Sequence, residues 1–186
     1  MTCETGKYPI RYLTTDSDGD CIKTAMCATS NDAFKHIARS SYEVFDLGRN
    51  ANTGIYIDHV NLLASDLKNQ GWNQGHTDAT GLGLTAECIA HELGWIDDAT
   101  FKSRVKLTLS SLAGYHENFS MPRSKNGWIP RFPNSNTGAY NGSTFEMMPS
   151  GLCTAGVLFA KTYTSKKFPK SDADASLIQK YAEEFY

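Results

Sequence analysis

Hydrophobic residues recur at intervals of three and four positions along much of this chain, a spacing that predicts amphipathic helices. Serine, asparagine or aspartate precedes several of these stretches, as is typical of helix N-termini. The segments between them are rich in glycine, proline and polar residues, which predicts loops. The expected helices cover residues 31–48, 77–93, 98–112, 149–164 and 171–186.

The helices expected at 77–93 and 149–164 have almost no polar face. The second contains the run LCTAGVLFA, and a helix that is apolar on all sides is usually buried. The first carries Gly81 and Gly83, each of which costs roughly 1 kcal/mol of helix stability relative to alanine. Such a cost indicates close backbone packing or a nearby ligand, so we predict that both helices are inner ones.

The helices expected at 98–112 and 171–186 are amphipathic and therefore outer, so inner and outer helices alternate along the chain. The connection of residues 115–143 is long for a compact domain. Its GWIPRFPN stretch holds too many aromatic and apolar residues for a disordered segment. We predict an all-α fold, an α/α toroid whose long loops gather at one end and form a site there.

Residues 1–30 show no helical pattern and are rich in threonine, serine, aspartate and glycine. Asp16, Asp18 and Asp20 alternate as the ligands of a calcium-binding loop do. Cys27 stands where such a loop requires a bidentate glutamate. We therefore interpret this stretch as a polar surface turn, with calcium binding as the weaker alternative.

The net charge of the chain argues against nucleic acid and membranes as partners. The 186 residues carry a formal net charge of −2 and a pI of about 6.2, which provides no positive field for nucleic acid or an anionic membrane. The sequence has no apolar run of membrane-spanning length. The first ten residues, MTCETGKYPI, lack the basic end and apolar core of a signal peptide. Localisation stays open, and a secreted or periplasmic location requires a truncated start.

The five cysteines do not match a metal site or a disulfide scaffold. Cys3, Cys21 and Cys27 lie in the polar N-terminal segment and allow one disulfide among them. Cys88 and Cys153 fall inside the two apolar helices. The spacing fits no zinc site, so we expect neither a metal nor a cofactor.

One carboxylate, Glu146, stands directly before the apolar helix that begins near Pro149. This position suits proton transfer, because an apolar environment favours the protonated form of an acid, as a general acid requires. The alternative is an acid that caps the helix or complements its dipole. The sequence leaves both interpretations open.

The other candidate residues belong to the predicted loops. Asp58 follows the short apolar run IYI. Three interpretations stay open for it: a site residue, a helix cap or an exposed loop residue. A tryptophan lies in GWNQG, as a mobile stacking platform or a plug, and further aromatic residues occupy the long connection. The predicted substrate-binding residues are Asp58, His59, Trp72, Trp128, Arg131 and Tyr140.

Four separated motifs occur in the order TGIYID, ATGLGLTAECIAHELGWIDDATFKSRVKLTLSSL, GWIPRFPNSNTG and STFEMMPSGLCTAGVLFAKTY. Together they resemble the glycoamylase-like domain of bacterial endo-β-1,2-glucanases, over roughly residues 32–186. The resemblance implies glycoside hydrolysis in the cleft of an (α/α)6 toroid and covers its first half, an incomplete barrel. We therefore expect a polar segment, residues 1–30, and a glycoamylase-like domain, residues 31–186, truncated at its C-terminus.

The resemblance implies that Glu146 is the acid before an inner helix and that Asp58 binds sugar hydroxyls. It also implies that the substrate is an oligo- or polysaccharide such as β-1,2-glucan. Hydrolysis needs a second carboxyl group, expected from the missing half. We therefore expect this chain alone to be weakly active or inactive. We also expect it to pair with a complementary C-terminal half, or with itself through the apolar faces of residues 82–90 and 152–160.

The alternative is a carbohydrate-binding or interaction module without catalysis. Its aromatic residues would stack on sugar faces, and Arg131 with neighbouring asparagines would bind hydroxyls. The two classes separate at Glu146, because Glu146→Gln abolishes hydrolysis in an enzyme but leaves sugar affinity within a few fold in either case.

Overall fold

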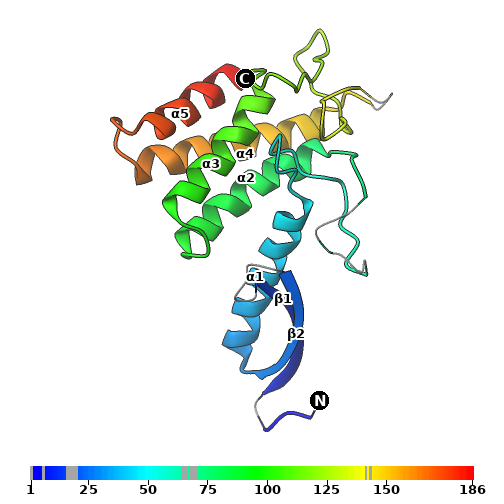
Figure 1. Ribbon diagram of the computed structural model, residues 1–186, viewed down its shortest axis with the longest axis vertical. Coiled ribbons are helices and arrows are strands. Elements are labelled where there is room, and N and C mark those ends of the chain that lie inside the picture. Colours follow the sequence, from blue (N-terminus) through cyan, green and yellow to red (C-terminus); the bar gives the residue numbers. More distant parts are fainter. Residues whose placement is uncertain are drawn as a thin grey trace. The chain divides into compact units, whose positions relative to one another are not determined.

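The computed structural model of the chain describes residues 2–5, 7–15, 21–63, 67, 71–140, 142 and 144–186. Within those residues, two strands precede five helices (Figure 1). The strands are β1 (Tyr8–Thr15) and β2 (Cys21–Ala28), and the helices are α1 (Ser30–Gly48), α2 (Thr77–Glu92), α3 (Asp98–Leu112), α4 (Met147–Lys167) and α5 (Ala173–Phe185).

Contacts between residues divide the chain into two compact units. The N-terminal unit comprises Met1–Leu47 and Val60–Gln70, and the helical unit comprises Gly48–His59 and Gly71–Tyr186. This division groups most of α1 with the strands, whereas the boundary at residue 30 remains a prediction from the sequence. All the candidate site residues belong to the helical unit.

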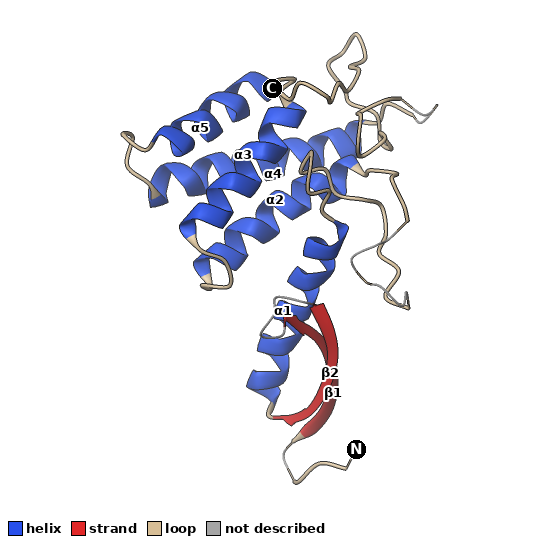
Figure 2. Ribbon diagram, viewed as in Figure 1, coloured by secondary structure: helices blue, strands red, loops and turns tan. Residues whose placement is uncertain are grey.

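The N-terminal unit contains an antiparallel hairpin of β1 and β2, with Tyr8 opposite Ala28 (Figure 2). The backbone N–H of Leu13 in β1 donates to the Ser40 hydroxyl of α1, at 3.1 Å, and the Leu13 side chain is buried. The sequence analysis assigned no secondary structure to these two strands, so the hairpin is a feature that it missed. Its strands have too many polar residues for a clear alternating pattern.

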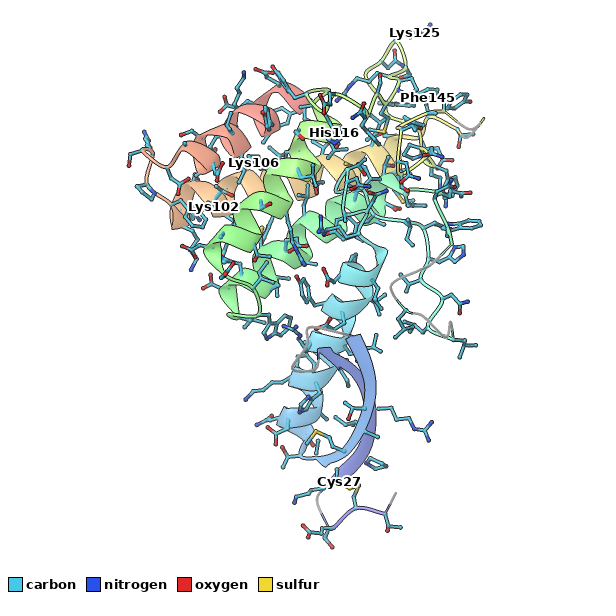
Figure 3. All side chains as sticks on the ribbon, in the orientation of Figure 1. Cys27, Lys102, Lys106, His116, Lys125 and Phe145 are labelled. Carbon is cyan, nitrogen blue, oxygen red and sulfur yellow. A yellow bond between two sulfur atoms is a disulfide. The ribbon has the colours of Figure 1, made fainter. Side chains whose placement is uncertain are left out.

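A disulfide joins Cys3 to Cys27 and so links the segment before β1 to the end of β2 (Figure 3). This is one of the pairings that the sequence left open. Asp16, Asp18 and Asp20, the three aspartates of the calcium-like pattern, lie outside the described residues.

The helical unit consists of two helical hairpins that lie side by side (Figure 1). Helix α2 packs mainly on α4, and α3 packs on α5. The helices α2 and α4, which the sequence marks as nearly nonpolar, thus form one layer, and the amphipathic α3 and α5 form the other. The predicted alternation of inner and outer helices is confirmed.

The two inner helices cross at a pair of glycines. A Cβ atom on Gly156 of α4 would lie 2.6 Å from the Cα atom of Gly81 in α2, and closer still to its carbonyl oxygen. A Cβ atom on Gly81 would lie 2.6 Å from the Cα atom of Cys153. A Cβ atom on Gly83 would meet the Tyr56 ring at 2.5 Å. The close backbone packing predicted from the glycines of α2 is therefore present.

The core of the helical unit lies between the two layers. Cys88 and Cys153 belong to it, and burial raises the pKa of each thiol to about 12, which makes both unreactive at neutral pH. The apolar side chains of this core include Ile55, Leu84, Phe101, Val105, Leu109, Leu112, Phe119, Ile129, Val157, Ile178 and Phe185.

Two lysines of α3 form ion pairs with aspartates at the start of α5 and so join the two helices of the outer layer. Lys102 and Lys106, labelled in Figure 3, pair with Asp172 at 2.6 Å and with Asp174 at 2.5 Å. Asp172 also caps α5 by accepting from the backbone N–H of Ala175. In the described part of the chain, no helix is both long and apolar enough to cross a membrane.

Candidate functional site

Short extended segments around residues 56–58, 74–77, 130–134 and 144–146 meet at the start of α2 and α4, and we call them the loop layer. Backbone bridges join residues that are far apart in sequence, such as Gln74 to Asn134 and Pro130 to Phe145. The backbone N–H of Thr77, the first residue of α2, donates to the Arg131 carbonyl oxygen at 3.1 Å. The layer therefore fixes the long connection against the N-terminal ends of both inner helices.

His76 belongs to this layer, directly before α2, and its side chain is 8% exposed. Its Nδ1 atom contacts the Asp78 carboxylate. Its Nε2 atom accepts from the Nε–H of Arg131 at 3.4 Å and lies 3.5 Å from the Asp58 carboxylate. The edge of the Phe132 ring packs against it. The sequence analysis missed His76, whose only local signal is its place before a helix.

Glu146 occupies the N-cap position of α4, yet its side chain makes no capping hydrogen bond. One carboxylate oxygen accepts from the Thr144 hydroxyl. The other lies 3.6 Å from Nη1 of Arg131. The alternative of a side-chain cap is therefore excluded, because the carboxylate turns away from the helix backbone and toward the loop layer.

Asp58, His59 and Trp72 form a second group beside His76. The Asp58 carboxylate lies 3.2 Å from Nδ1 of His59, and the His59 ring packs on Trp72 with ring centres 4.6 Å apart. Trp72 is 42% exposed. Asp58 contacts both histidines, so it connects the exposed aromatic pair to the buried His76.

The structure places the two remaining candidates differently. Tyr140 stacks on Phe145, the residue before Glu146, with ring centres 5.3 Å apart. Trp128 lines a hollow of about 360 Å³, together with Met147 and Phe185. Tyr140 thus neighbours the Glu146 end of the loop layer, whereas Trp128 belongs to this hollow.

Burial lowers the pKa of His76 below its ordinary value of 6.5. The Asp58 carboxylate acts in the opposite direction, the Arg131 guanidinium lowers the pKa further, and Glu146 raises it. The balance favours a neutral imidazole at pH 7. Among the described residues, no group of three metal-ligating side chains is placed to hold a metal ion.

We expect the free energy of unfolding to fall as the pH is lowered below about 6.5. In that window the unfolded chain binds a proton at His76 and the folded chain does not, so protons favour the unfolded state. Urea unfolding at a series of pH values measures the effect. His76→Gln should flatten the dependence, because glutamine does not titrate. A slope in His76→Gln equal to that of the unsubstituted chain would contradict the assignment.

No protein-family model matches the sequence, and no curated protein matches it. Solved structures do resemble the fold. A candidate glucoamylase from Bacteroides uniformis matches with a TM-score of 0.65 and 15% identity, over 84% of this chain and 35% of its own.

Two of the similar structures are glucanases. The endo-β-1,2-glucanase from Chitinophaga pinensis, in complex with sophorotriose and glucose, has a TM-score of 0.64 and 19% identity, over 83% of this chain and 36% of its own. The β-1,2-glucanase from Parabacteroides distasonis has a TM-score of 0.65 and 16% identity, over 98% of this chain and 25% of its own.

The chain thus spans between 25% and 36% of the length of these relatives. Identities of 15% to 19% show a shared fold and do not transfer a reaction. Together with the two helical hairpins and the loop layer at one end, the match confirms the architecture predicted from the sequence: this chain has the fold of part of an α/α toroid, of the kind found in glucoamylase-like proteins and endo-β-1,2-glucanases.

Proposed function

We propose that the loop layer is the sugar-binding part of a glycoside hydrolase site that acts on a β-glucan, with Glu146 as the general acid. One observation carries the proposal: Glu146 stands at the start of an inner helix and yet directs its carboxylate to Arg131 and Thr144 instead of capping the helix. The likeness to two β-1,2-glucanases supports a β-1,2-linked glucan as the substrate.

Glycoside hydrolysis requires a carboxylic acid that protonates the leaving oxygen and a second carboxyl group that acts as base or nucleophile. The Glu146 side chain is 36% exposed, so a sugar can reach it. Its 3.6 Å separation from Arg131 exceeds a hydrogen bond, and such a pair opens at little cost. Arg131 can then bind a sugar hydroxyl. Glu146, in its protonated form, can donate its proton to the leaving oxygen.

The remaining candidates fit binding and not proton transfer. The Asp58 carboxylate accepts hydrogen bonds from sugar hydroxyls, and His59 orients it from one side. The exposed faces of Trp72 and Tyr140 suit stacking on sugar rings. Trp128 offers the same chemistry in its own hollow, as a proposed further contact for a longer chain of sugars.

Enzyme assays test the proposal directly. The purified chain is incubated with a panel of β-glucans linked β-1,2, β-1,3 and β-1,4, and newly formed reducing ends are counted. We expect slow release that is fastest from the β-1,2-linked polymer. Absence of release from every polymer, by a chain shown to be folded by circular dichroism, would overturn the hydrolase assignment for this chain and favour a binding module.

We further propose that additional toroid helices, in the same or another polypeptide, cover the open side of the inner layer and supply the second carboxyl group. Leu82 and Ile89 on α2 are 49% and 47% exposed, and Leu152 and Phe159 on α4 are 40% and 47% exposed. Each pair is two helical turns apart and shares one side of its helix. Exposed apolar faces of this kind mark contact surfaces.

We expect the chain to associate with itself when these faces have no other cover, because association removes their apolar side chains from water. Light scattering after size-exclusion chromatography should give a mass above the 20.5 kDa of one chain. The double substitution Ile89→Glu and Phe159→Glu should restore that single-chain mass. Leu177→Glu on α5, at a residue of similar exposure outside the inner layer, serves as the control. A monomeric unsubstituted chain would contradict the expectation.

A further inference from the structure

His76 makes two polar contacts that together define its protonation state. Asp78 offers only acceptor atoms to Nδ1, so Nδ1 must carry the hydrogen. Arg131 offers only a donor, its Nε–H, to Nε2 at 3.4 Å, so Nε2 must be unprotonated. A single arrangement satisfies both contacts: a neutral imidazole with its hydrogen on Nδ1.

The same Nε2 atom has a competing neighbour. Asp58 Oδ1 lies 3.5 Å away, and an unprotonated nitrogen cannot bond to a carboxylate because both are acceptors. A proton on Nε2 would reverse the preference. His76 would then donate to Asp58, while the Nε–H of Arg131 would lose its acceptor and face a positive charge.

Arg131 is held in place by this contact and by one ring. Its Nε–H donates to His76, its guanidinium lies over the Phe132 ring at 4.7 Å, and Nη1 faces Glu146 at 3.6 Å. Phe132 also packs edge-on against His76, with ring centres 4.6 Å apart. His76 and Phe132 together therefore direct the guanidinium toward Glu146.

We propose that His76 is a positioning residue: its unprotonated Nε2 holds Arg131 against Glu146, and protonation of Nε2 transfers His76 to Asp58 and releases Arg131. The charged and titratable groups that face the ring are Asp58, Asp78, Arg131 and Glu146, and His59 lies on the far side of Asp58. The inference rests on the role proposed for Glu146, since Arg131 acts on the reaction through that carboxylate.

The release has a direct chemical consequence for Glu146. With Arg131 in place, its guanidinium lies 3.6 Å from the Glu146 carboxylate. With Arg131 released, that cation no longer faces the carboxylate, and both side chains can contact a sugar. Burial, which lowers the pKa of His76, confines the exchange to acid pH. The layer therefore couples one proton on His76 to the position of Arg131 beside Glu146.

Nitrogen-15 NMR of the histidine side chains of the full chain tests the assignment without any substrate. At about pH 7.5, where an unperturbed histidine is neutral, we expect His76 to carry its hydrogen on Nδ1. In Arg131→Met the Nε2 acceptor loses its donor and a nearby positive charge, so the midpoint of the His76 titration should move to higher pH. A hydrogen on Nε2 at that pH, or a midpoint unchanged in Arg131→Met, would overturn the proposal.

The pH profile of hydrolysis separates positioning from a purely structural role. His76→Gln replaces Nε2 with an amide oxygen that accepts from Arg131 but cannot titrate. The turnover of this variant, whatever its size, should lose the limb of the pH profile that His76 causes. A profile identical to that of the unsubstituted chain would overturn the proposal. If the chain hydrolyses no glucan, the proposed function fails alone, because the NMR titration still decides whether His76 holds Arg131.

Discussion

Replacing Gly156 with alanine should destabilise the helical unit by about 3 kcal/mol or more, the upper end of the cost of overpacking a tightly packed core. The new Cβ atom would lie within 2.6 Å of the Gly81 backbone, which belongs to a helix and cannot yield as a flexible side chain does. The two inner helices must then separate. Their separation would expose the core around Cys88 and Cys153.

The same helix provides a matched control. Nothing lies within 4 Å of the position that a Cβ atom on Gly151 would occupy. Gly151→Ala should therefore stabilise the chain by roughly 0.5–1 kcal/mol, the ordinary gain in helix propensity. Urea unfolding followed by circular dichroism measures both variants. A Gly156→Ala chain as stable as the Gly151→Ala chain would show that the inner helices do not cross at these glycines.

Replacing Glu146 with glutamine should lower glucan turnover by about 10²–10⁴-fold, the usual contribution of a positioned general acid. The glutamine amide keeps the shape of the carboxyl group, and its oxygen accepts from the Thr144 hydroxyl. It has no acidic proton to transfer to the leaving oxygen. Affinity for a β-1,2-linked oligosaccharide should change only a few fold, because Asp58, Trp72 and Arg131 are retained.

Glu117→Gln removes an exposed carboxylate near the end of α3, at the other end of the long connection from Glu146, and serves as the control, with turnover expected to stay within about twofold. Reducing-end release and isothermal titration calorimetry provide the two readouts. Equal turnover in the Glu146→Gln and Glu117→Gln chains would remove Glu146 from the reaction. A parallel loss of turnover and affinity in Glu146→Gln would make Glu146 a binding residue.

The helices could be predicted from the sequence because their signals are local. Apolar periodicity and capping residues determine where α2 to α5 lie, and the small residues of α2 and α4 already indicate close packing. The hairpin of β1 and β2 could not be found this way. Its strands contain too many polar residues to give a clear alternation of apolar and polar positions.

The candidate site divides along the same line. Glu146 and Asp58 were identified because each is an acid beside an apolar run, a pattern visible in one stretch of sequence. His76 was not identified because its significance comes from Arg131, 55 positions further along the chain. Backbone bridges in the loop layer create that contact. No periodicity or local motif encodes a contact of that kind.

Trp128 shows the opposite limit of sequence reasoning. An exposed tryptophan in a long loop is equally suited to a sugar site and to a separate hollow, and the structure places it in the hollow with Met147 and Phe185. The composition of the loop could not distinguish these positions. The chemistry of an aromatic residue can be read from the sequence, but its neighbours depend on the packing of the whole loop.

Titration of the folded chain with a β-1,2-linked glucotriose, followed by NMR, tests most directly whether the loop layer binds sugar. The predicted result is a set of saturable shifts at the side chains of His59, Trp72 and His76, weaker with the β-1,4-linked trisaccharide and lost in Asp58→Ala. Shifts confined to Trp128, or none at millimolar sugar in a folded chain, would contradict the assignment of this layer as a carbohydrate site.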